Sequence, residues 1–139
     1  METSWKKYEA MPENYYSIRD DVVKSAKNAG ISDAKLIKLE LGLEEIVVNV
    51  ISYAYDSAHR PILVKYYISG DRFIIEIVDY GKKFNPLEAP QRTNPPSLNQ
   101  RPGGYGIFLV KKFFASVTYE YEEIEGFPAN HLTMELTIR

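Results

Sequence analysis

Residues 39–55 read LELGLEEIVVNVISYAY and predict the longest helix of this chain. At about 100° per residue, the apolar side chains of this stretch and of the residues just before it fall on one stripe. The stripe consists of Leu36, Leu39, Leu43, Ile46, Val47, Val50 and Ala54. We expect the helix to begin after an N-cap at Ser32, to run to about Tyr53, and to pack this stripe against a sheet.

A different face of the same helix carries two polar side chains. Glu45 and Asn49 are four residues apart and therefore neighbours on the helix surface, and Gly42 beside them leaves room above the backbone. A carboxylate and an amide oxygen in this arrangement could share a metal ion or a water molecule. Magnesium prefers such oxygen ligands and usually keeps waters and phosphate oxygens as well. The alternative is that both residues are ordinary solvated side chains.

The flanking segments predict further helices and strands around this helix. Helices are expected over residues 14–29, ending at Gly30, and over residues 105–114. Strands are expected over residues 62–68, 73–79, 117–121 and 132–138. Turns are expected at Ser69-Gly70-Asp71 and near Gly126 and Pro128. The first twelve residues are expected to form a short strand or an arm. This order predicts one domain over residues 1–139, of the α+β class, with helices on one face of a mixed, mostly antiparallel sheet.

The strand expected over residues 73–79 ends in a carboxylate. By twofold alternation Phe73, Ile75, Ile77 and Asp79 point to one face, and the first three are core residues. A buried carboxylate needs hydrogen-bond donors, and the 6-amino group of adenine is a donor of the right kind. Gly81 lets the backbone pass close to such a ligand. The alternative is an ordinary Asp-Tyr-Gly turn that ends the strand.

The stretch RPGGYGIFLVKK, residues 101–112, places glycines before a helix. Backbone N–H groups and the helix dipole favour phosphate there, and Gly103, Gly104 and Gly106 permit close approach. The spacing matches neither a Walker P-loop nor the Rossmann fingerprint. The alternative is that the glycines end a long proline-rich loop and that Tyr105 starts a packed helix.

Composition narrows the classes of function. The chain has 139 residues, a formal net charge of −2 and no cysteine. The charge gives no sign of a direct nucleic-acid partner, and the absence of cysteine excludes disulfides and thiolate zinc sites. Neither a signal-peptide core nor an apolar run of membrane-spanning length is visible, so a cytoplasmic protein that does not enter the membrane is expected.

Taken in order, three motifs resemble those of the GHKL, or Bergerat-fold, ATPases, in particular the small bacterial anti-sigma factor serine/threonine kinases. Residues 45–55, EIVVNVISYAY, resemble E-A-x-x-N-x-x-x-H-A-Y. Residues 79–86 match D-x-G-x-x-F-[DN]-P, and residues 104–110 match G-x-G-[LI]-x-L-[VI]. The resemblance extends over roughly residues 10–138. It implies the two-layer Bergerat ATP-binding fold, with residues 82–103 as the ATP lid and with ATP and Mg²⁺ as cofactors.

The resemblance also implies roles for individual residues. Asn49 would coordinate the magnesium ion bound to the ATP phosphates, and Glu45 would be the general base toward the attacking hydroxyl or water. Asp79 would bond the adenine amine, and Gly81 would make room for the ring. Gly104 and Gly106, with Ile107 in the same motif, would carry the lid into the helix that faces the phosphates.

Two departures from the family pattern concern residues near this site. Tyr53 stands where the first motif has histidine. A threonine commonly lines the adenine site from the last strand, but here Leu132, Met134, Leu136 and Ile138 form the inward row, which puts Thr133 on the opposite face. Neither change removes the residues expected to hold the metal or the adenine.

The resemblance implies a protein serine/threonine kinase that phosphorylates an anti-anti-sigma (STAS-like) partner and sequesters a sigma factor. The alternatives are a nucleotide-loaded, partner-binding switch with little or no kinase activity, and a structural domain without nucleotide. A homodimer is a further possibility, for which Ile37, Leu41 and Val48 form a second apolar patch on the long helix. The alternative for this patch is packing against the first helix.

Overall fold

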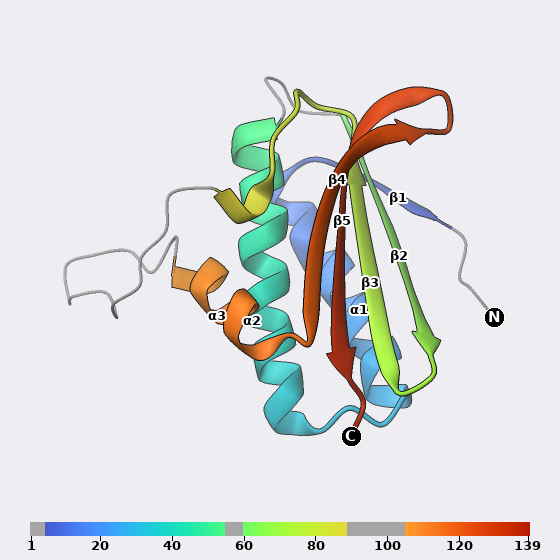
Figure 1. Ribbon diagram of the computed structural model, residues 1–139, viewed down its shortest axis with the longest axis vertical. Coiled ribbons are helices and arrows are strands. Elements are labelled where there is room, and N and C mark those ends of the chain that lie inside the picture. The colour runs from blue at the N-terminus through green and yellow to red at the C-terminus, as the bar shows by residue number, and fades with distance from the viewer. Residues whose placement is uncertain (1–4, 55–59, 89–104) are drawn as a thin grey trace.

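A computed structural model describes residues 5–54, 60–88 and 105–139 of the chain. The molecule has two layers, with the helices packed on one face of a single sheet (Figure 1). The strands are β1 (Lys6–Glu9), β2 (Pro61–Ser69), β3 (Arg72–Asp79), β4 (Ser116–Ile124) and β5 (Phe127–Thr137). The helices are η1 (Pro12–Asn14), α1 (Tyr15–Asn28), α2 (Asp33–Asn49), η2 (Val50–Ala54), η3 (Pro86–Glu88) and α3 (Tyr105–Phe113).

The five strands are ordered β1-β2-β3-β5-β4, and every pair of neighbours is antiparallel. The predicted α+β class and two-layer architecture are confirmed, and the described strands contain no parallel pair. Because β5 lies between β3 and β4, the end of β3 lies next to Asn130 of β5, its register partner at Asp79. Two segments 51 residues apart in the chain therefore meet at one end of the sheet.

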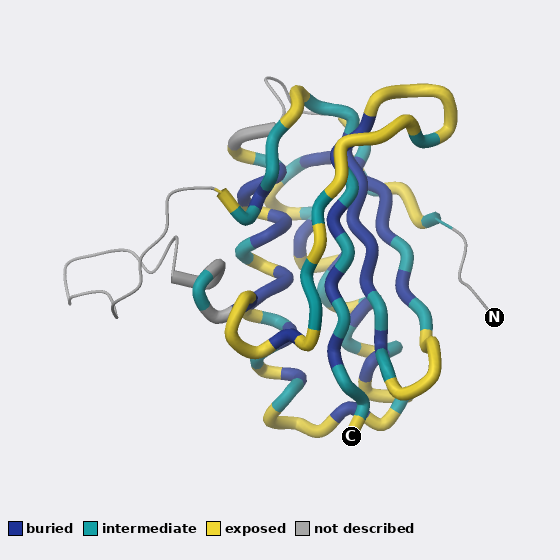
Figure 2. Tube along the Cα trace, viewed as in Figure 1, coloured by how far each residue is buried: buried dark blue, intermediate teal, exposed yellow. Residues whose placement is uncertain are grey.

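Helix α2 forms as its sequence predicts. The side chain of Ser32 accepts a hydrogen bond from the backbone N–H of Lys35 at 3.3 Å, which caps the first turn. The predicted stripe is buried from Leu36 to Val50, and the side chain of Ala54 lies outside the described residues. After Asn49 the helix continues as the π-helical turn η2. Phe73, Ile75 and Ile77 of β3 are buried in the same core, as alternation predicts. Figure 2 shows that the central strands of the sheet are its most buried part.

The β4–β5 hairpin differs from the prediction. Its turn is the dipeptide Glu125-Gly126, with positive φ angles of 52° and 89°, and the strands extend to Ile124 and Phe127 on either side. The predicted strands, 117–121 and 132–138, were therefore too short. Two positive φ angles in succession are typical of the tight turns that close hairpins. Pro128 belongs to β5, and its partner is Glu123, beyond the end of β3, where a missing N–H breaks no bond to β3.

Two interpretations of the surface of α2 are wrong. The space above Gly42 is filled by side chains of α3 and of the residue after it, because a Cβ atom there would lie 2.9 Å from both Val110 Cγ2 and Phe114 Cε1. The apolar patch does not pack against α1: Ile37, Leu41 and Val48 are 60%, 47% and 43% exposed. A homodimer through this patch stays a prediction. Among the helices of the described residues, none is long and apolar enough to cross a membrane.

Candidate functional site

Asp79 ends β3 as a buried carboxylate that is 2% exposed. Its Oδ1 accepts hydrogen bonds from the backbone N–H of Gly81 at 2.9 Å and from Asn130 Nδ2 at 2.8 Å. No described residue donates to Oδ2. Because no buried polar side-chain atom in the described parts of the chain lacks a partner, Oδ2 keeps access to solvent. One oxygen is thus held by the protein, and the other remains available to a donor from outside.

The protonation of Asp79 reflects its burial. Loss of hydration raises the pKa of the Asp79 carboxyl to about 6, and the hydrogen bonds from Asn130 and Gly81 oppose this change. The carboxylate form is therefore present at neutral pH but is held there against its surroundings. A further donor directed at Oδ2, such as an exocyclic amine, would stabilise this form.

Asn130 is the residue of this site that the sequence prediction missed. Its side chain is 2% exposed and makes four hydrogen bonds. Nδ2 donates to Asp79 Oδ1 and to the carbonyl of Lys82, both at 2.8 Å. Oδ1 accepts from the N–H of Phe84 at 2.9 Å and from the hydroxyl of Tyr119 at 2.5 Å. The inward row of the last strand, extended back by two residues from Leu132, would have identified Asn130, but the strand was predicted to start later.

Asn49, the predicted metal ligand, contacts the segment that follows β3 from the helix layer. Asn49 is 5% exposed, and its Nδ2 donates to the carbonyl of Pro86 at 3.3 Å. A carbonyl only accepts, so Nδ2 faces Pro86 and Oδ1 points elsewhere. The segment 80–88 therefore joins Asp79 and Asn130 on the sheet to Asn49 on α2, at one end of the molecule (Figure 1). Glu45 lies one turn earlier on α2 and is half-buried.

An open pocket of about 370 Å³ lies beside this network. Its described lining residues are Lys83, Phe84, Asn85, Glu88 and Tyr119. Asp79 and Asn49 do not line it, but both Phe84 and Tyr119 contact Asn130, which connects the pocket to Asp79. Its size is within the range of small-molecule sites. A second open pocket, between α1 and the β1–β2 edge, contains none of the predicted site residues.

The oxygen donors near Asn49 fit a magnesium ion only together with a nucleotide. The described residues contain no cluster of three or more His, Cys, Asp or Glu side chains that could hold a metal. One amide oxygen and one carboxylate, from Asn49 and Glu45, are too few for a site made by protein alone. They are sufficient where phosphates and waters supply the remaining ligands, as magnesium prefers.

The third motif is described only in part. Helix α3 begins at Tyr105, as predicted, so Gly106 and Ile107 belong to its first turn. Their side-chain surroundings and all of Gly104 lie outside the described residues. Of the predicted lid, residues 82–88 are described and include the short helix η3, whereas residues 89–103 lie outside the described residues.

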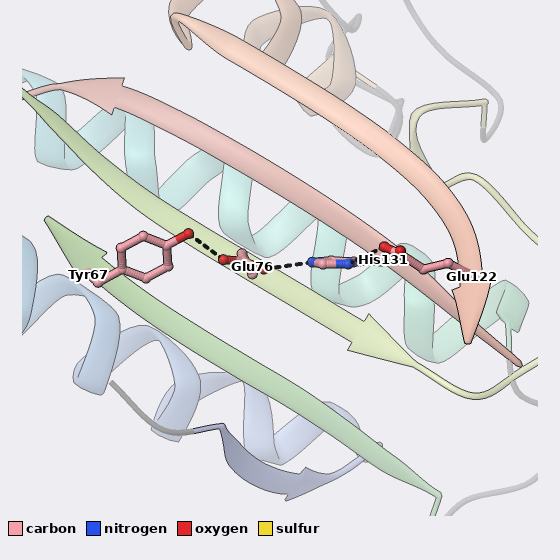
Figure 3. A network of polar contacts seen from close by, with 4 residues as sticks. All are labelled: Tyr67, Glu76, Glu122 and His131. Carbon is pink, nitrogen blue, oxygen red and sulfur yellow. Dashed lines mark hydrogen bonds and ion pairs between the residues drawn. The ribbon is translucent and has the colours of Figure 1, made fainter. Parts of the chain in front are cut away.

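The opposite face of the sheet carries a separate polar network (Figure 3). Tyr67 donates to Glu76, and the two ring nitrogens of His131 lie 2.7 Å from carboxylate oxygens of Glu76 and Glu122. The ring of Trp5 packs edge-on against His131 at 6.0 Å. Because His131 follows Asn130 in the strand, it points to the other face and does not belong to the site.

Comparison with known proteins identifies the class to which this fold and site belong. Residues 8–136 match the histidine kinase-like ATPase domain, and the chain belongs to that family. The fold predicted from the three motifs is therefore confirmed, and the family name indicates ATP as the nucleotide.

Individual relatives are more distant. The chain is similar to the serine-protein kinase RsbW of Oceanobacillus iheyensis, with 29% identity over 98 residues, or 66% of this chain and 62% of that protein. It is also similar to the anti-sigma F factor of Thermoanaerobacter pseudethanolicus, with 25% identity over 104 residues, or 74% of this chain and 69% of that protein. The aligned region spans less than two thirds of the kinase relative.

Proposed function

We propose that the chain binds ATP with Mg²⁺ and transfers the γ-phosphoryl group to a serine or threonine of an anti-anti-sigma, STAS-like partner, and that it sequesters a sigma factor. The observation that carries this proposal is the connection of Asp79, Asn130 and Asn49 through the segment 80–88. A purine held at Asp79 would have its phosphates extend along the helix layer toward Asn49.

Each residue has one task in this proposal. Asp79 Oδ2 accepts a hydrogen bond from the adenine amine, and Gly81 leaves room for the ring. Asn49 and the phosphates hold the magnesium ion, which neutralises charge on the transferred group when bound. Glu45, one turn earlier, orients the attacking hydroxyl and accepts its proton. Gly104, Gly106 and Ile107 contribute the backbone that faces the phosphates.

The relatives support the regulatory part of the proposal. One of the two relatives is named a serine-protein kinase and the other an anti-sigma F factor. An anti-sigma kinase needs both a nucleotide site and a protein surface, and the family match accounts for the first of these. The sigma factor and the phosphorylated partner are proposed by this similarity alone.

A thermal unfolding experiment tests the nucleotide site. A ligand that binds only the folded chain raises the free energy of unfolding by RT ln(1 + [L]/Kd), or about 4 kcal/mol at a thousandfold excess over Kd. We expect Mg-ATP to raise the melting temperature and expect the Asp79→Asn variant to show little increase. An equal increase in the variant would show that Asp79 does not recognise the purine. No increase in the wild type would show that the chain does not bind Mg-ATP.

Phosphoryl transfer is tested with Glu45→Ala. With [γ-³²P]ATP and an anti-anti-sigma protein encoded next to the chain's own gene, we expect the wild type to label the partner. The variant should retain the thermal shift with Mg-ATP but lose about 100-fold or more in transfer rate, because a positioned base contributes that much. Equal rates in variant and wild type would exclude Glu45 as the base.

The second candidate function is a nucleotide-loaded switch that holds a partner without phosphorylating it. Tyr53 favours this candidate, because it replaces the histidine of the first motif close to Asn49 in the sequence. The same labelling experiment separates the two functions. Partner binding that depends on Mg-ATP, without transfer of label, would identify the switch.

A further inference from the structure

The amide of Asn130 has no hydrogen-bonding capacity left for a ligand. Its two N–H donors go to Asp79 Oδ1 and the Lys82 carbonyl, and its oxygen accepts from the Phe84 N–H and the Tyr119 hydroxyl. The orientation of the amide is fixed, because the carbonyl of Lys82 can only accept and the N–H of Phe84 can only donate. Asn130 therefore acts on other groups and not on a ligand directly.

These four bonds join three separate segments. Asp79 belongs to the end of β3, Tyr119 to β4, and Lys82 with Phe84 to the segment that leads to Pro86 and Asn49. Occupation of Asp79 Oδ1 by two donors orients the carboxylate, so a ligand meets only Oδ2. The same amide that orients this carboxylate holds the backbone at residues 82 and 84.

We infer that Asn130 is a positioning residue that couples two events: recognition of an amino-purine at Asp79 and ordering of residues 82–86 against the sheet. The inference rests on the proposed nucleotide site and adds its regulation. A purine amine that fixes Asp79 tightens the contact with Asn130 and, through it, the backbone bonds to Lys82 and Phe84. The segment that holds Asn49 through Pro86 then responds to the purine before any phosphate contact is made.

The isosteric change Asn130→Asp removes both donors of the side chain and keeps its acceptor. The new carboxylate can still accept from the Phe84 N–H and the Tyr119 hydroxyl, but when ionised it can donate neither to Asp79 nor to the Lys82 carbonyl. Two carboxylates at this distance share one proton, which returns to the pair as the pH falls and restores the donor to Asp79, while the bond to the Lys82 carbonyl stays lost. The other titratable or charged groups near the pair include Tyr119 and Tyr121 from β4, Lys82 and Lys83 from the following segment, Glu88 of η3, and Arg60, which donates to the carbonyl of Tyr80.

The wild type and the variant should therefore depend on pH in opposite directions. In the wild type the pKa of Asp79 is about 6, so adenosine affinity is steady above that pH and falls below it as the acceptor is protonated. In Asn130→Asp, affinity is weakest at about pH 8 and rises as the pH falls toward about 6. Adenosine is the probe because it carries no phosphate that titrates in this range.

The first measurement is an NMR titration with adenosine at several pH values. We expect Asn130→Asp to bind about tenfold or more weakly than the wild type at pH 8 and to recover most of this loss near pH 6. Asn14→Asp is the matched control, since it makes the same change of charge at an asparagine that contacts the Glu9 carbonyl. It should keep the wild-type profile.

The second measurement is amide hydrogen exchange with and without adenosine. In the wild type, adenosine should slow exchange at Phe84, whose N–H donates to Asn130. In Asn130→Ala this N–H should exchange faster, and adenosine should no longer slow it. Leu87 is the reference amide, because its N–H bonds the side chain of Asn85 in the same segment. Its exchange without ligand should be the same in both proteins.

The outcomes separate the inference from the proposed function. A wild type that binds no adenosine at any pH overturns both. If the wild type binds but Asn130→Asp keeps the wild-type pH profile, or Asn14→Asp also inverts it, only the inference is overturned. Protection of Phe84 by adenosine in Asn130→Ala, equal to that in the wild type, overturns the coupling as well.

Discussion

Asp79 is a buried carboxylate, and its burial lowers the stability of the unliganded protein at neutral pH. Because its pKa is raised from 3.8 to about 6, the folded state binds a proton more tightly than the unfolded state. Stability from this residue is therefore highest below pH 4 and is lost as the pH rises to about 6. The linkage amounts to roughly 3 kcal/mol. Such a cost is usual where a carboxylate is retained for binding.

The Asp79→Asn variant should be at least as stable as the wild type at pH 7 without ligand. The amide oxygen can still accept from Gly81 and Asn130, and no charge is buried. Urea unfolding at pH 7 and pH 4 measures the difference, which should shrink toward pH 4. Asp71→Asn is the control, because it makes the same change at an exposed aspartate of the β2–β3 turn. A variant less stable than the wild type at pH 7, by the same amount at both pH values, would contradict this account.

Individual residues also show what the sequence could and could not predict. The inward position of Asp79 was predicted because strand alternation is a local pattern, and the ligand roles of Asp79 and Asn49 stay predictions. Asn130 was not predicted, because the last strand was predicted to start only at residue 132, and because its partnership with Asp79 depends on the long-range pairing of β5 with β3. The surroundings of Gly42 were misjudged for the same reason, since α3 approaches it from 68 residues further along the chain at Val110.

Helix α2 is held between the sheet and α3, and Gly42 sets how closely α3 can approach. We expect Gly42→Ala to destabilise the protein by about 1 kcal/mol, because overpacking costs roughly 1–3 kcal/mol while helix propensity returns about 1 kcal/mol. The midpoint of urea unfolding measures this. Leu41→Ala, at the exposed neighbouring position, should change stability by less than about 0.5 kcal/mol. A Gly42→Ala protein more stable than the wild type would show that α3 can move away at little cost.

The β4–β5 hairpin contains a non-glycine residue in the left-handed region at Glu125. Asn tolerates this conformation and precedes glycine in the most favoured two-residue turns. We expect Glu125→Asn to raise the free energy of unfolding by about 0.5–1 kcal/mol and Gly126→Ala to lower it by about 1 kcal/mol or more. Urea unfolding of both variants is the measurement. The essential result is that the two variants change the free energy of unfolding in opposite directions. If both lowered it by the same amount, the turn would differ from the one described.

At the scale of the whole molecule, the order of helical and strand patterns was sufficient to predict the fold class. It was not sufficient to predict the lengths of β4 and β5. From the sequence alone, Glu122, Glu123 and Glu125 look like loop residues. They belong to the hairpin because β4 is an edge strand with exposed side chains and because the strands pair to the turn. The site is likewise one end of a two-layer molecule, and residues from both layers contribute to it.

This layout predicts where a nucleotide will change the protein. Addition of ADP should slow amide exchange at Gly81 and Phe84, at the end of β3, and leave the amides of Gly30 and Ile138, outside the site, unchanged. Hydrogen exchange followed by NMR resolves these amides. Uniform protection over both sets would mean global stabilisation without a local contact, which would contradict the placement of the site.

Trp5, the single tryptophan, offers a practical consequence. Its indole packs on His131, with Lys65 over its ring at 4.6 Å, on the face of the sheet that bears no helix. The emission of an indole depends on the groups packed against it, so the fluorescence of this chain should report changes in the contacts of Trp5 with His131 and Lys65. No dye or added reporter would be needed to follow the back of β5 while a ligand is titrated against its front.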